Sequence, residues 1–95
     1  MLDEREAGRL AELFGALSDP SRVRIIAELT RGEMNVGSLA EAVGLSGSAV
    51  SHQLRSLRQL KLVRARKVGR QVYYALDDEH IADLYARGLD HVRHG

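Results

Sequence analysis

The sequence contains no cysteine, and this absence removes several kinds of function at once. Without thiols the chain can form no disulfide, no thiolate metal site and no cysteine nucleophile. It also lacks any long apolar run, and its first residues, Met1 to Glu6, are acidic rather than apolar. A membrane span needs about 20 apolar residues, and a signal peptide needs an apolar segment after its basic start. We therefore expect a cytoplasmic protein with no membrane partner.

Acidic residues are missing from one continuous stretch of the chain. No Asp or Glu occurs from Ala42 to Leu76, although this stretch holds seven of the 14 Lys and Arg residues. The net charge of the whole protein is only +1, so the positive charge is concentrated rather than excessive. A solvated face usually mixes both signs, whereas a contiguous cationic block is typical of a surface that binds phosphates. The pattern favours a nucleic-acid partner over an ordinary solvated face.

Aromatic residues are also scarce, at 4% of the 95 residues. The adjacent pair Tyr73 and Tyr74 would face opposite sides of a strand, so at least one should pack in the core. Sequence-specific RNA binding relies on exposed aromatics that stack on bases, so double-stranded DNA is the expected partner. The length allows a single domain over residues 1–95 with a small core, and dimerisation would bury more apolar surface.

Apolar periodicity and capping residues predict five helices and one β-hairpin. The first helix should run from about Asp3 to Leu17, and Asp19-Pro20 should start a second that Gly32 stops. Ser38 and Glu41 form a capping box for a short third helix that ends at Gly44. A fourth helix is expected over about 47–60 and a last one over about 78–93. Between them, the β-branched and aromatic segments 62–67 and 71–76, separated by Gly69, predict the hairpin.

This order of elements predicts a winged helix-turn-helix domain, mainly α with one β-hairpin. The helix-turn-helix should span about 38–60 and the wing about 62–76. Outward-facing residues early in the recognition helix contact base edges, while basic residues neutralise phosphates. His52 alone could be a surface histidine without a partner, but the two serines beside it favour DNA contact. The predicted DNA-binding residues are Ser48, Ser51, His52, Arg55 and Arg58 on the helix and Arg66, Lys67 and Arg70 on the wing.

Four side chains of the last helix, Asp78, His80, His91 and His94, form a pattern that one helix cannot use alone. His91 and His94 share a face, and we expect a frayed first turn to bring Asp78 and His80 together. The 11 residues from His80 to His91 make about three turns and rise about 16 Å, too far for one ion. A second helix packed antiparallel on a two-fold axis would complete two sites, each with three imidazoles and one carboxylate. The alternative is that these are solvated residues suited to the helix dipole.

Three strings of residues resemble the ArsR/SmtB-type metal-sensing repressors. Leu17 to Arg22 is similar to the start of their second helix, Ser48 to Leu54 to their recognition helix, and Gly69 to Tyr74 to their wing. The resemblance extends over about residues 8–94. It implies a homodimer formed by the first and last helices, operator binding by the metal-free form, and control of a gene such as a metal exporter. One subgroup has a site on the last helix whose pattern matches Asp78, His80, His91 and His94 position by position.

The ligand types indicate which metal is expected. Three imidazoles and one carboxylate suit Zn(II) in tetrahedral geometry, and Co(II) would fit the same ligands. Ni(II) usually takes more ligands, and the sequence ends one residue after His94, so we expect zinc with Co(II) or Ni(II) as alternatives. We expect metal binding to release DNA by changing the geometry of the dimer.

Two other functions are alternatives to a zinc-responsive repressor. A zinc enzyme would keep an open coordination position for water, whereas four ligands close the site and no base is evident. We therefore expect neither an enzyme nor a small organic substrate. The other alternative is a dimeric DNA-binding repressor that responds to Ni(II), Co(II) or a non-metal signal, its last helix serving only dimerisation in the last case.

Overall fold

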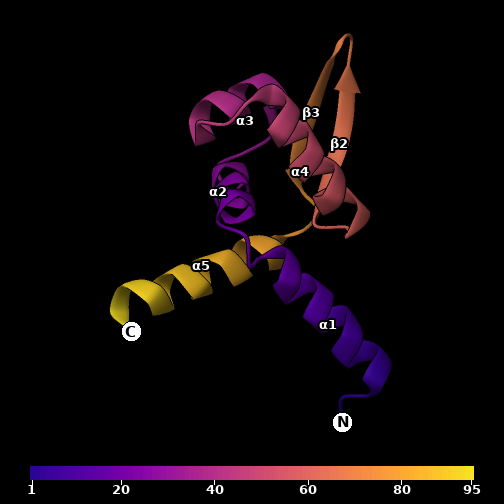
Figure 1. The fold of residues 1–95 in the computed structure, drawn as a ribbon, viewed down its shortest axis with the longest axis vertical. Helices are drawn as coiled ribbons and strands as arrows, with labels where there is room; N and C mark the ends of the chain where they lie inside the picture. The colour runs from indigo at the N-terminus through magenta and orange to yellow at the C-terminus, as the bar shows by residue number, and fades with distance from the viewer.

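A computed structural model describes residues 1–95 as five helices and a three-stranded antiparallel sheet of order β1-β3-β2. The helices splay apart at one end of the molecule, where α1 and α5 point in different directions, and the β2–β3 hairpin rises at the other end (Figure 1). The elements are α1 (Glu4–Ala16), α2 (Pro20–Leu29), β1 (Met34–Asn35), α3 (Val36–Val43), α4 (Gly47–Gln59), β2 (Val63–Val68), β3 (Gln71–Leu76) and α5 (Glu79–His94).

The expected winged helix-turn-helix architecture is confirmed, and two predicted boundaries are correct: Asp19 caps the start of α2 and Gly44 ends α3. Asp3 caps α1 with a capping box to Glu6, and the Asp19 carboxylate accepts a hydrogen bond from the Arg22 amide at 3.1 Å. Gly44 ends α3 in the left-handed conformation, at φ 71°, which costs an L-residue roughly 1–2 kcal/mol but glycine little. These are local interactions between near neighbours, which explains why the sequence pattern found them.

The start of α3 was predicted wrongly. The helix begins three residues earlier than the Ser38 cap implied, because Asn35 is the N-cap and accepts a hydrogen bond from the Ser38 amide at 2.8 Å. Asn35 is also the last residue of β1, a two-residue strand that pairs with β3 and that the sequence did not predict. This pairing holds Asn35 in the extended backbone that an N-cap requires. The wing is therefore two strands of a three-stranded sheet.

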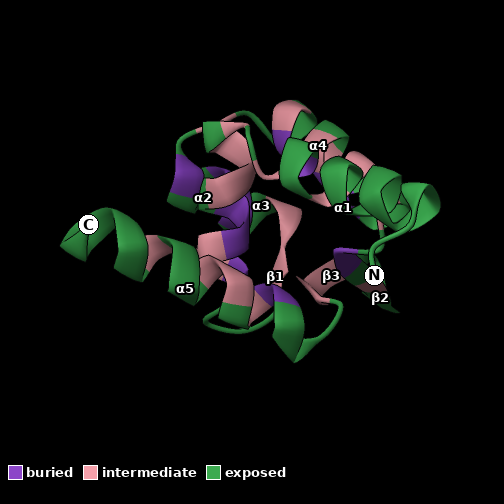
Figure 2. Ribbon diagram, turned by 90° about the horizontal axis from the view of Figure 1, so that it is seen from below, coloured by how far each residue is buried: buried purple, intermediate pink, exposed green.

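One hydrophobic core lies among α2, α3, α4 and the base of the hairpin. Its fully buried residues come from the middle helices, and Tyr74 packs against it as expected. By contrast, α1 and the far half of α5 are mostly exposed (Figure 2). Ile81 at the start of α5 is buried, whereas Val92 near its end is 78% exposed. The chain therefore covers the apolar side of α5 at its start and leaves it open at its end. No helix has the length and apolar content to cross a membrane.

Candidate functional site

Helix α4 presents a polar and basic surface because its apolar residues all point into the core. Val50, Leu54 and Leu57 are fully buried, and the Ser46 hydroxyl caps the helix by accepting from the Ala49 amide at 3.0 Å. The outward side carries the predicted DNA-binding residues: Ser48, His52, Arg55 and Arg58 are exposed, and Ser51 is half-buried. No ion pair occupies either arginine. This face is therefore free to meet an anionic partner.

A polar contact that the sequence did not predict ties α4 to the start of α2. The Arg22 Nε atom donates a hydrogen bond to Gln53 Oε1 at 2.6 Å. Gln53 Nε2 lies 3.5 Å from the Asp19 carboxylate oxygen that also accepts the Arg22 amide. The contact joins α4 to α2 and so fixes the rotation of α4 about its own axis. Since Gln53 directly follows His52, this rotation also sets the direction in which His52 faces. Spacing along one helix cannot reveal a contact between two helices 31 residues apart, so sequence reasoning had no signal for it.

The tip of the wing carries two free cations. Lys67 lies just before the turn, in which Gly69 adopts φ 60°, and Arg70 lies just after Gly69. Both side chains are exposed and form no ion pair. The turn between β2 and β3 lies at the end of the hairpin farthest from the free ends of α1 and α5 (Figure 1). Two positive charges without an ion-pair partner therefore stand at the outer end of the hairpin.

Arg66, the third predicted cation of the wing, is already engaged. Its Nε atom donates to Glu33 Oε2 at 3.3 Å, and its Nη2 atom forms a second, shorter hydrogen bond to Oε1. Its guanidinium also lies over the Tyr73 ring, 5.8 Å from the ring centroid. The hydrogen bond and charge of Arg66 hold the pKa of Glu33 below its ordinary value, and Glu33 in turn raises the pKa of Arg66. The sequence analysis did not single out Glu33.

The first half of the predicted metal site lies at the start of α5. Asp78 is the N-cap, and its Oδ1 atom accepts hydrogen bonds from the amides of His80 at 2.9 Å and Ile81 at 3.3 Å. Its second oxygen, Oδ2, lies 3.5 Å from His80 Nδ1. The two side chains converge because Asp78 is extended, at φ −155° and ψ 177°. The prediction that a frayed first turn brings them together is wrong, because Asp78 caps an intact first turn. One carboxylate oxygen and one imidazole therefore remain available side by side.

The second half lies in the last turn of the same helix. His91 and His94 are exposed and three residues apart, so their side chains share a face. His94 Nδ1 lies 2.9 Å from Asp90 Oδ1 and 3.1 Å from the Asp90 carbonyl oxygen. If Nδ1 carries the proton, it donates a hydrogen bond to Asp90. The other ring nitrogen, Nε2, is then free to coordinate a metal ion. Asp90 is a second residue that the sequence pattern did not single out.

The four predicted ligands fit a metal ion only if two chains contribute. No three potential ligand side chains within the chain are close enough to hold an ion, and the two pairs lie at opposite ends of α5. Each pair by itself supplies two suitable donors: one carboxylate and one imidazole at the start, and two imidazoles at the end. The chemistry of these donors suits a borderline divalent ion such as Zn(II).

The fold and the surface of α4 and the wing define a winged helix-turn-helix regulator, and the comparisons give its family. Residues 19–65 match the family described as "Bacterial regulatory protein, arsR family". A relative, the transcriptional repressor SmtB homolog of Synechocystis sp., is 51% identical over 93% of this chain and 67% of its own length. The chain belongs to the ArsR family. Because its named relatives are transcriptional regulators, the expectation that it is not an enzyme is confirmed.

Solved structures agree with this assignment. The crystal structure of the AntR antimony-specific transcriptional repressor has a TM-score of 0.90 at 32% identity, covering 99% of this chain and 86% of that one. The homodimeric winged helix-turn-helix DNA-binding domain Mb0332 from Mycobacterium bovis has a TM-score of 0.85 at 29% identity, covering 98% and 89%. The fold is thus shared over almost the whole chain, including α1 and α5.

Proposed function

We propose that the chain is a homodimeric repressor that binds operator DNA in the metal-free state and releases it when Zn(II) binds between the subunits. It would act in the cytoplasm on genes of metal export or homeostasis. The observation that carries the proposal is the division of four ligand side chains into two pairs at opposite ends of α5.

The DNA-binding part rests on the surface formed by α4 and the wing. Ser48, Ser51 and His52 would contact base edges, since hydroxyls and imidazoles can donate or accept. Arg55 and Arg58 would contact phosphates, together with cations of the wing tip. Ser51 is half-buried, so of the three it has the least side chain to offer to a base.

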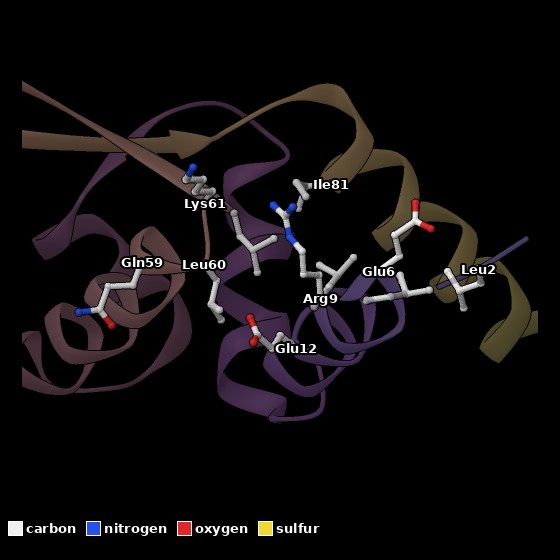
Figure 3. A pocket seen from close by; sticks show the side chains of 11 residues that line it. Leu2, Glu6, Arg9, Glu12, Gln59, Leu60, Lys61 and Ile81 are labelled. Atoms are coloured by element: carbon white, nitrogen blue, oxygen red, sulfur yellow. The ribbon is translucent and has the colours of Figure 1, made fainter. Parts of the chain in front are cut away.

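Dimerisation is supported by apolar surface that the chain leaves uncovered. Phe14 of α1 is 52% exposed and Val92 of α5 is 78% exposed. A groove of about 460 Å³ between α2 and α5 is lined by eight hydrophobic residues out of nine, Tyr85 and Leu89 among them. A second open groove lies between α1 and the end of α4, where Leu2 and Leu60 line its walls (Figure 3). We propose that a second copy covers this surface, and the homodimeric state of the relative Mb0332 supports the proposal.

The metal part follows from the two-fold symmetry of such a dimer. If the α5 helices of two protomers run antiparallel, Asp78 and His80 of one protomer face His91 and His94 of its partner. Two equivalent sites of three nitrogens and one oxygen result. An ion bound there would link the two α5 helices and so favour one geometry of the dimer. The recognition helices move with the dimer, which couples the metal sites to DNA.

Zinc is the proposed effector because the donor set offers four ligands and no thiolate. Tetrahedral N₃O coordination suits Zn(II), and Co(II) fits the same set. The relatives respond to different elements, since AntR is antimony-specific and another relative is a cadmium resistance regulator. The same test therefore includes Ni(II) and Co(II). It also covers the alternative of a repressor with a non-metal signal, which none of the three metals would release from DNA.

The test is a DNA-binding titration with and without metal. A duplex is first selected from a random library by the chelator-treated protein, and its affinity is then measured by fluorescence anisotropy in chelator, Zn(II), Co(II) and Ni(II). We expect tight binding in chelator and release by Zn(II). By reciprocity, the duplex should weaken Zn(II) binding by the same factor. Tight binding that no metal alters would contradict the sensing part alone, and no selectable duplex would contradict the DNA-binding part.

Two variants sharpen the result. His91→Gln removes one proposed ligand from an exposed position, so it should bind the metal-free duplex normally and lose the response to Zn(II). Arg93→Gln is the matched control, because it alters the same exposed turn about 200° around the helix from His91. The control should behave as the parent protein does. Release by Zn(II) from His91→Gln would show that His91 is not a ligand.

A further inference from the structure

One group of interacting side chains joins the outer strand of the wing to the segment that precedes β1. Arg66 of β2 forms two hydrogen bonds with the Glu33 carboxylate and lies over the ring of Tyr73. Among the basic residues from Arg55 to Arg70, only Arg66 forms an ion pair. Although its side chain is 61% exposed, the ion pair makes Arg66 the least available of the cations predicted to bind DNA. We call Glu33, Arg66 and Tyr73 the wing clasp.

The clasp crosses the whole sheet. Tyr73 lies on the central strand β3, opposite Asn35 of β1 on one side and Arg66 of β2 on the other. Glu33 directly precedes β1, so the ion pair reaches from one edge of the sheet to the other above Tyr73. Asn35 is also the N-cap of α3, the first helix of the helix-turn-helix. The clasp thus links the outer strand of the wing to the segment from which α3 begins.

Electrostatics oppose a direct contact between Arg66 and DNA. A carboxylate bound to the guanidinium cancels most of its charge, and the carboxylate itself would repel a phosphate brought close to it. Lys67 and Arg70 have no such neighbour and stand at the tip. A bidentate Arg–carboxylate pair also has a defined geometry, whereas an exposed pair of this kind contributes little to stability. Its main effect is therefore on the orientation of the wing.

We propose that Arg66 is a positioning residue that orients the wing through Glu33 and Tyr73, and that Lys67 and Arg70 make the phosphate contacts. This rests on the DNA-binding part of the proposed function. It reassigns Arg66, which the sequence placed among the DNA contacts, and assigns a role to Glu33.

The salt dependence of DNA binding separates the two roles. Each phosphate contact contributes a slope of about 0.9 to the plot of log affinity against log salt concentration. Lys67→Gln and Arg70→Gln should each lower the magnitude of the slope by about 1 for each wing bound. Arg66→Gln and Glu33→Gln should both weaken binding and leave the slope unchanged. A slope lowered by Arg66→Gln, or an affinity raised by Glu33→Gln, overturns the proposal.

Two further variants test the geometry. Arg66→Lys keeps the charge but cannot form the bidentate pair, so it should bind DNA as weakly as Arg66→Gln. Full binding by Arg66→Lys would assign Arg66 to a phosphate. The double variant Glu33→Gln/Arg66→Gln should be no weaker than either single variant, because the two side chains act as one unit. Additive losses contradict the clasp.

Amide hydrogen exchange in DNA-free protein keeps the test independent of the proposed function. Glu33→Gln should speed exchange of the backbone amides in β2 and β3, because the outer strand loses its link to the first edge of the sheet. Exchange in α4 should not change. If the parent protein binds no duplex, the DNA-binding proposal fails, and the exchange data still decide the clasp. Unchanged exchange in the hairpin overturns it.

Discussion

The strongest prediction concerns subunit mixing, because only a site shared between protomers can be rebuilt from two defective chains. His80→Ala and His91→Ala should each abolish high-affinity zinc binding in a homodimer, since each removes a ligand from both sites. In the mixed dimer, one site lacks both histidines. The other combines His80 of the second chain with His91 of the first and is complete. The mixed dimer should therefore bind one equivalent of zinc.

The magnitude follows from the dimensions of α5. Zinc–nitrogen bonds are about 2.0–2.1 Å long, so the two nitrogen atoms that coordinate one ion lie at most about 4 Å apart. His80 and His91 are separated by about 16 Å along the helix at 1.5 Å per residue. This rise far exceeds the spacing of two donor atoms on one ion, and no three potential ligand side chains within the chain lie close enough to hold an ion. Loss of a ligand should lower affinity by more than the roughly 10–100-fold that loss of a supporting group causes.

The assay uses mixed dimers purified through two different affinity tags, with zinc measured by competition against a chromophoric chelator. The reverse arrangement is the control. A chain carrying both His80→Ala and His91→Ala, paired with an unmodified chain, should bind no zinc tightly because each site has lost one ligand. If that control binds one equivalent and the first mixture binds none, each site lies within one chain and the shared-site reasoning is refuted.

Three further predictions test individual side chains. Asp90→Asn should weaken Zn(II) binding about tenfold in a chelator competition, because the hydrogen bond that orients His94 is altered; unchanged affinity would show that Asp90 has no part in the site. Gly88→Ala should raise the melting temperature of the protein, since alanine gains about 1 kcal/mol in a helix interior and the added Cβ meets no atom of its chain within 4 Å. A lowered melting temperature would indicate that a partner helix approaches at Gly88. Because Arg66 lowers the pKa of Glu33 from its ordinary 4.5, the ion pair should add its small stabilisation in full above pH 4.5 and lose it as pH falls through the lowered pKa. Urea unfolding of the parent and of Glu33→Gln should therefore differ at neutral pH and converge in acid, and a difference that persists in strong acid would contradict this origin.

Much of this protein follows from interactions between residues close in sequence. Apolar periodicity and capping residues placed five helices, although α3 begins earlier than predicted, and the predicted cap at Asp19 sets the start of α2. The alternating basic and apolar segments predicted the hairpin, and only the bounds of β2 are displaced, by one residue. The ligand pattern on α5 needed only helix geometry to show that its two halves cannot meet within one chain, and the structure agrees. Each of these signals acts within a few residues of the chain.

Contacts between distant segments could be found only in the folded structure. Asn35 and Ser38 are both good capping residues, and the pairing of β1 with β3 decides between them by holding Asn35 extended. Arg66 looked like any other wing cation until the strand order brought Glu33 across the sheet to it. Sequence spacing carries no information about which elements become neighbours, because that depends on how the core closes. The sequence by itself thus determined the five helices, the hairpin, the distribution of charge and the spacing of the proposed metal ligands, and the tertiary structure decided which side chains remain free to bind.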